Sequence, residues 1–202
     1  MPTTQSPSPK IHQSIYFLLL SNLLPLAGVL FWDWNVGSIL LLYWIENIII
    51  GLFNIPRMIK KPLGKSRDKY VSDSTVKTFI IVFFILHYGL FCLSHYYFIS
   101  LIMEFARTKI EFANIFFPVA ALIVSHGLSY FNNFIKNREY LRGSIQKQMK
   151  APYSRVLATT FVVVFGGTVS FFLAEPLTAL VALVIIKTIF DLRAHKRVHQ
   201  FN

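Results

Sequence analysis

FIIVFFILHYGLFCLSHYYF, residues 79–98, decides the fold class because almost every side chain in this long run is apolar. At 1.5 Å per residue, a helix of this length crosses a hydrocarbon core about 30 Å thick. A strand in a soluble core is much shorter. Two histidines, His87 and His95, lie inside the run. Ionisable groups in a membrane are costly and mark functional sites, so the run predicts a membrane helix beside a polar interior.

The composition of the whole chain agrees with a membrane protein. The 202 residues are 54% hydrophobic and 14% charged, with a mean hydropathy of +0.54. Soluble domains carry about 25% charged residues. The single cysteine, Cys92, excludes an intramolecular disulfide and a cysteine-based metal cluster. We therefore expect one membrane domain and no separate soluble domain.

Further apolar runs predict an all-α, polytopic bundle of six membrane helices. The predicted helices cover about residues 14–32, 36–55, 74–103, 114–135, 153–173 and 177–194. Pro56 is expected to end the second helix because proline cannot continue the hydrogen-bond ladder. The domain organisation that follows is a disordered segment at 1–13, a transmembrane domain at 14–195 and a basic tail at 196–202.

The net charge of +11 is distributed between the apolar runs. Basic residues are in excess in the loops at 56–73 and 136–152 and in the tail, whereas the loop at 104–113 is neutral. The positive-inside rule therefore predicts six spans with both termini cytoplasmic, in the cell (inner) membrane. The same rule explains the charge better than a nucleic-acid partner, so no nucleic acid is expected. The expected partners are the bilayer and anionic lipid headgroups at the basic loops, and a homo-oligomer is compatible with the pattern.

Ionisable residues of several predicted helices share one depth. By the helical rise, four lie within about 5 Å of the midplane: Glu46, His87, His126 and Lys187. His95 lies about 8 Å toward the outside, and Asp191 and His195 lie about 7 and 13 Å toward the inside. Tyr153 and Arg155, at the inner end of their helix, are expected to anchor it at the interface.

The first interpretation of this polar set is structural. Glu46 would pair with Lys187, and Lys187 would also meet Asp191 one turn further along the helix. Histidine and asparagine side chains would form hydrogen bonds between helices. No activity is implied by this interpretation.

The second interpretation is a metal site. His87, His126 and Glu46 supply two imidazoles and one carboxylate, a set that suits zinc or iron in a metal-dependent intramembrane enzyme. The supporting polar residues are Lys187, Asp191, His95, Asn47, Ser129, Asn133 and His195. Lys187 at the same depth argues against it, because a cation beside a cation is unfavourable.

Two other interpretations concern transport and proteolysis. The polar residues extend through much of the membrane, as they do in small proton- or ion-coupled transporters. Gly127-Leu128-Ser129 is superficially similar to the serine motif of rhomboid proteases, but Tyr130 stands where that motif needs glycine. The sequence therefore leaves open whether the protein is an enzyme.

Five segments give the chain a family resemblance: YWIENIIIG (residues 43–51), HYGLFCLSH (87–95), SHGLSYFNNF (125–134), PYSRV (152–156) and KTIFDLRAH (187–195). With them the chain resembles an uncharacterised bacterial family of multi-pass membrane proteins, defined as a domain of unknown function. The resemblance implies a bacterial membrane protein and brings no activity, substrate or cofactor.

Overall fold

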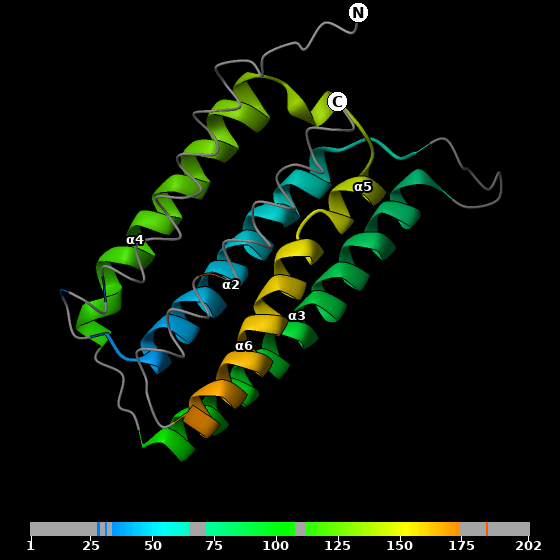
Figure 1. Ribbon diagram of the computed structural model, residues 1–202. Coiled ribbons are helices and arrows are strands. Elements are labelled where there is room, and N and C mark those ends of the chain that lie inside the picture. Colours follow the sequence, from blue (N-terminus) through cyan, green and yellow to red (C-terminus); the bar gives the residue numbers. More distant parts are fainter. Residues whose placement is uncertain are drawn as a thin grey trace, which may run out of the picture.

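The computed structural model describes residues 34–64, 72–107 and 112–173, together with Gly28, Phe31 and Ile185. These residues form helices and connecting turns and contain no strand, which confirms the all-α prediction for the described part (Figure 1). The elements are α2 (Val36–Lys60), α3 (Asp73–Ala106), α4 (Phe112–Ser129), the π-helix η1 (Tyr130–Lys136), the 3₁₀ turn η2 (Glu139–Leu141), α5 (Ile145–Lys150) and α6 (Tyr153–Leu173).

Polar side chains fix where several of these helices begin. The side-chain oxygen of Asn35 accepts a hydrogen bond from the Ser38 amide (2.9 Å) at the start of α2. Ser72 caps α3 through the Thr75 amide, and Ser144 caps α5 through the Lys147 amide. Such caps satisfy amide groups that have no partner within the helix, so these residues set the helix starts.

Helix α2 continues through Pro56 and ends only at Lys60, so the predicted end at Pro56 was wrong. Proline has no amide hydrogen, so the carbonyl of Leu52 receives no helix hydrogen bond from residue 56. The Leu52 side chain lies on an exposed face of the helix. Beyond the proline, Met58 is completely buried against neighbouring elements. Tertiary packing therefore outweighs the local helix-breaking tendency of Pro56.

Among the described residues, three helices are long and apolar enough to cross a membrane: Gly37–Lys60, Asp73–Glu104 and Asn114–Lys136. The helix predicted at 153–173 is present as α6 with those bounds. The helices predicted at 14–32 and 177–194 fall almost entirely outside the described residues, and so do both termini. The described chain thus establishes a helical protein with three candidate spans.

Helix α2 lies at the centre and contacts α3, α4, α5 and α6 (Figure 1). Buried apolar side chains form two clusters along it, one around Ile39, Leu40 and Val163 and one around Met58 and Phe84. In contrast, α3 and α4 leave many large apolar side chains exposed. On α3 these run from Phe79 to Leu101, and on α4 from Phe116 into η1 at Phe131. Exposed apolar faces of this extent are typical of helices that face lipid.

Candidate functional site

Hydrogen-bonded polar side chains gather where α2, α3 and α6 meet. At the centre of this junction, the Asn47 side chain donates a hydrogen bond to Oγ1 of Thr159 (2.7 Å), and both residues are buried. The hydroxyl of Tyr88 donates to the Asn47 backbone carbonyl (2.9 Å). These bonds connect one residue from each of the three helices. We call the hydrogen-bonded groups along this junction the polar seam.

Two further contacts extend the polar seam toward its ends. Toward α5, the Gln148 side chain donates to Oδ1 of Asn54 (2.7 Å). Toward the other end, Nε2 of buried His95 lies 2.8 Å from the Thr160 hydroxyl. The seam therefore uses histidine, amide and hydroxyl groups whose partners come from another helix, as expected for polar side chains that hold membrane helices together.

An ion pair joins α2 to α6 beside the seam. Nη1 of Arg155 lies 3.2 Å from Oε1 of Glu46. The Glu46 side chain is 18% exposed, whereas the Arg155 side chain is 46% exposed. His126 of α4 packs against Phe53 with its ring centroid 6.3 Å away, and Glu46 and Arg155 are close enough for their charges to act on it. Two of the predicted ligands, Glu46 and His126, therefore share a neighbourhood with an arginine.

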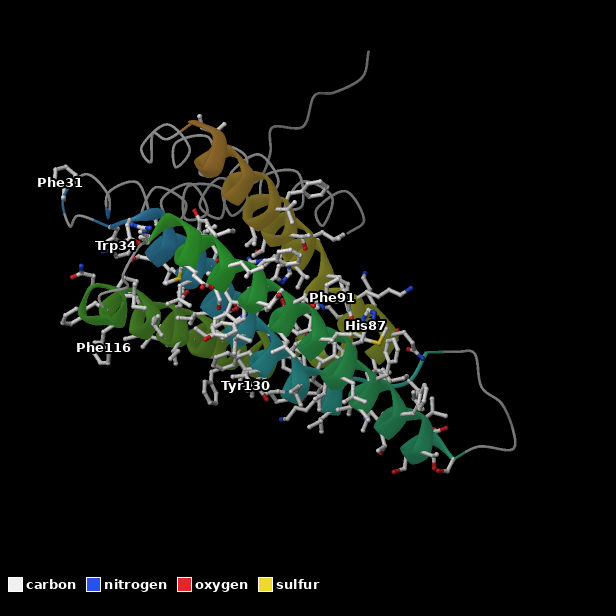
Figure 2. All side chains as sticks on the ribbon, turned by 90° about the horizontal axis from the view of Figure 1, so that it is seen from below. Phe31, Trp34, His87, Phe91, Phe116 and Tyr130 are labelled. Atoms are coloured by element: carbon white, nitrogen blue, oxygen red, sulfur yellow. The ribbon has the colours of Figure 1, made fainter. Side chains whose placement is uncertain are left out.

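His87 lies in an aromatic setting at the junction of α3 and α6. Its Nδ1 lies 2.8 Å from the Tyr153 hydroxyl. Phe83 stacks on the imidazole at a centroid distance of 5.1 Å, and Phe91 meets it edge-on at 5.2 Å. Figure 2 shows His87 and Phe91 on α3 close to the beginning of α6. His87 is held by α6 and by its own helix, rather than by Glu46 or His126.

The residues do not fit the predicted metal site. Within the described ranges, no group of three or more histidine, cysteine, aspartate or glutamate side chains is close enough to hold a metal ion. His87 is engaged with Tyr153, and Glu46 pairs with Arg155, a cation that opposes a metal at that carboxylate. We therefore derive no chemistry through zinc or iron.

The remaining predicted site residues lie on an exposed surface or outside the described residues. Asn133 donates weakly to the Ser129 hydroxyl (3.4 Å) on an exposed part of α4 and η1. Lys187, Asp191 and His195 lie outside the described residues, so the predicted pairing of Glu46 with Lys187 stays a prediction.

A scan of protein-family models matches one family, described as a family of unknown function (DUF6498), over residues 4–202. The chain belongs to DUF6498. No curated protein and no solved structure matches it. Three of the segments that carried the resemblance supply residues of the polar seam of this DUF6498 chain or of the contacts beside it: residues 43–51 bring Glu46 and Asn47, residues 87–95 bring His87 and Tyr88, and residues 152–156 bring Arg155.

Two contacts of the DUF6498 site were not predicted from the sequence. Arg155 and Tyr153, which were expected to anchor a helix end at the interface, contact Glu46 and His87. The position of Arg155 could have indicated its role. Arg155 lies inside the predicted helix and one turn before Thr159, so both side chains are on one face of that helix. Thr159 itself carried no recognisable signal.

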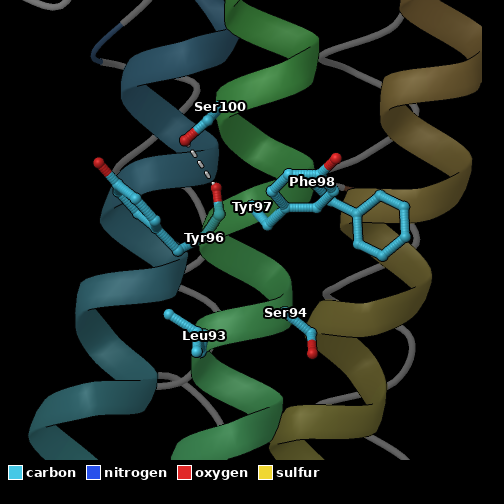
Figure 3. A pocket seen from close by; sticks show the side chains of 6 residues that line it. All are labelled: Leu93, Ser94, Tyr96, Tyr97, Phe98 and Ser100. Atoms are coloured by element: carbon cyan, nitrogen blue, oxygen red, sulfur yellow. Dashed lines mark hydrogen bonds between the residues drawn. The ribbon is translucent and has the colours of Figure 1, made fainter.

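A separate depression lies on the outer surface of α3, away from the seam of this DUF6498 protein. It encloses about 480 Å³ and is lined by Leu93, Ser94, Tyr96, Tyr97, Phe98 and Ser100 (Figure 3). Ser94 and Ser100 donate their hydroxyls to the carbonyls of Leu90 and Tyr96 in their own helix. With these two hydroxyls engaged, the depression offers a largely apolar surface.

Proposed function

We propose that the protein is a multi-pass protein of the bacterial inner membrane, with six helices in residues 14–195 and both termini in the cytoplasm. We further propose that it moves protons or a small ion, and that Glu46 and Arg155 form its coupling site. His126 lies within electrostatic range of both. Three candidate spans and one-sided loop charge support the membrane part of the proposal.

One observation carries the proposed activity: the side chain of Arg155 is 46% exposed although its carboxylate partner lies deep in a candidate span. Glu46 is about 14 Å from the start of the span Gly37–Lys60. An arginine this exposed at that depth faces water or a polar ligand, because charged groups are not stable against acyl chains. An ion pair that opens to water can exchange a proton or bind an ion.

A purely structural role is the second candidate, and a specific observation favours it. The buried side chains of Asn47, Thr159 and Asn54 all have hydrogen-bond partners within the bundle. A satisfied polar network of this kind rigidifies a protein without any turnover.

Proton flux separates the two candidates. The purified chain is reconstituted in liposomes that hold a pH-sensitive dye, and a potassium gradient with valinomycin sets the membrane potential. We expect the wild type to change the internal pH faster than protein-free liposomes do, and Glu46→Gln to return the rate to the protein-free level. Glu104→Gln, which removes an exposed acid at the end of α3, is the matched control and should keep the flux.

Folded wild type that moves no protons faster than protein-free liposomes would overturn the proton relay. Replacing the potassium gradient with sodium or chloride gradients, with the corresponding indicator dyes, tests the small-ion version. If no gradient is dissipated, the structural role remains.

A further inference from the structure

Helices α2 and α4 finish and α5 begins toward the same end of the molecule (Figure 1). The sequence around this end is rich in basic residues. The exposed basic residues there are Lys60, Lys136, Arg138, Arg142, Lys147 and Lys150. Among the described residues of this end, the exposed acids are Asp73 and Glu139. The described charged residues of the opposite end are Glu104 and Arg107, whose opposite charges cancel. The charge is therefore concentrated at one end of the bundle.

The segment that carries most of these charges is fixed to the end of α2. Buried Lys61 donates through Nζ to the carbonyl of Glu139 (2.6 Å) and to the carbonyl of Arg142. The Ile145 amide donates to the carbonyl of Pro62 (2.9 Å). Since the backbone at Glu139, Arg142 and Ile145 is held in this way, Arg142 and the adjacent Arg138 and Lys147 are presented from a fixed part of the chain, which lowers the entropy cost of binding an anion.

Apolar side chains stand exposed between the charges. Leu141 is 65% exposed and lies directly before Arg142, and Ile59 is 55% exposed and lies directly before Lys60. Exposed aliphatic groups beside arginine and lysine suit the boundary between headgroups and acyl chains, where the apolar group enters the lipid and the cation meets phosphate. A soluble polyanion would give no reason to expose Leu141.

We propose that this basic end, defined by Lys60, Arg138, Arg142 and Lys147 with Leu141 between them, is a binding site for the phosphate headgroups of anionic phospholipids. The inference deepens the membrane placement proposed above, because it requires this end to meet the lipid headgroups of one leaflet. A lysine or arginine near an anionic membrane surface strengthens binding by about fivefold. Removing three such charges should therefore weaken binding by roughly a hundredfold if the contributions add.

The test measures binding of short-chain phosphatidylglycerol to the full chain in neutral detergent, by native mass spectrometry. We expect the wild type to retain this lipid, and the variant Arg138→Gln/Arg142→Gln/Lys147→Gln to lose it. Arg107→Gln, at the opposite end, is the control and should bind as the wild type does. Short-chain phosphatidylcholine should bind far more weakly, because its headgroup has no net charge.

Two further measurements show whether the site recognises a lipid headgroup or free phosphate. Glycerol phosphate has the same anionic group without acyl chains, and Leu141→Ser removes the apolar contact alone. We expect glycerol phosphate to bind weakly and Leu141→Ser to weaken phosphatidylglycerol binding while thermal stability is kept.

The proposal is overturned if the triple variant, folded by its melting temperature, binds phosphatidylglycerol as tightly as the wild type. Equal binding of glycerol phosphate would also overturn it, since the site would then recognise free phosphate. Glu46→Gln should bind the lipid normally, so a failure of ion flux and a failure of lipid binding are distinguishable.

Discussion

Gly51 of α2 lies against the ring of Tyr88 on α3. A Cβ atom at residue 51 would be 2.5 Å from Cε1 of Tyr88, well inside van der Waals contact. The ring cannot move away without breaking a hydrogen bond, because its hydroxyl donates to the carbonyl of Asn47 one turn earlier on α2. At this position the absence of a side chain sets the spacing between two helices of the polar seam.

Gly51→Ala is therefore expected to destabilise the fold by about 1–3 kcal/mol, the usual cost of overpacking. Gly89→Ala is the matched control, because no atom lies within 4 Å of a Cβ built there. Alanine favours helix over glycine by about 1 kcal/mol, so the control should be neutral or stabilising. The melting temperature in detergent measures both, and equal values for the two variants would contradict the packing argument.

The Glu46–Arg155 contact predicts energetic coupling between the two positions. Glu46→Gln and Arg155→Gln should each lower stability, and the double variant should lose less than the sum of the two. The coupling expected for residues in contact is about 0.5–3 kcal/mol. Chemical denaturation of all four proteins in the cycle gives the value. Additive losses would mean that the two side chains do not interact in the folded protein.

The sequence assigned depths to the candidate site residues but did not predict their partners. Depth counts residues along one helix and says nothing of how each helix is rotated about its axis. The rotation of α3 brings His87 to Tyr153, and the long side chain of Arg155 reaches the carboxylate of Glu46. Neither contact follows from depth alone.

At the scale of elements, buried Lys61 is one of the residues that connect the end of α2 to the segment after η1. Burial lowers the pKa of Lys61 from its ordinary value of 10.5, since the ammonium loses water when the segment closes over it. The folded protein then releases this proton at a lower pH than the unfolded chain does. Stability should rise with pH between the lowered pKa and 10.5, because the unfolded state binds more protons there.

Lys61→Met is expected to flatten this rise, since the variant has no proton to release at that position. Lys60→Met removes an exposed lysine of the same helix end and should keep the slope. Melting temperatures measured between pH 7 and the onset of alkaline unfolding compare the three proteins. A slope in Lys61→Met equal to that of the wild type would show that another group causes the rise.

The elements themselves show where sequence patterns succeed and fail. The helix at 153–173 was predicted with the observed bounds, because loop residues and Pro152 precede a clear apolar run. The π-helix at Tyr130–Lys136 was missed and taken as the end of a regular helix. No residue type marks a π-helix. It forms here with Phe134 buried and beneath the cations of Arg57 and Lys61, contacts that only the tertiary structure supplies.

For the whole molecule, loop charge predicts the orientation. Reporter fusions after Lys65, Lys109 and Lys147 should locate to the inside, outside and inside, because the basic loops are retained in the cytoplasm. Alkaline phosphatase and green fluorescent protein fusions measure the two sides. An external position at Lys65 or Lys147 would rule out six spans with both termini inside, and would also move the basic end to the other leaflet.

The exposed apolar faces of α3 and α4 differ in height. Phe79 to Leu101 on α3 covers roughly 33 Å of helix, whereas Phe116 to Phe131 covers roughly 22 Å. In the membrane placement proposed above, a bilayer of uniform thickness would not match both of these faces. The lipid would thin beside α4, or the bundle would tilt, and either adjustment costs fractions of a kcal/mol per ångström of mismatch. This asymmetry would then give the protein a preference among membranes of different acyl-chain length.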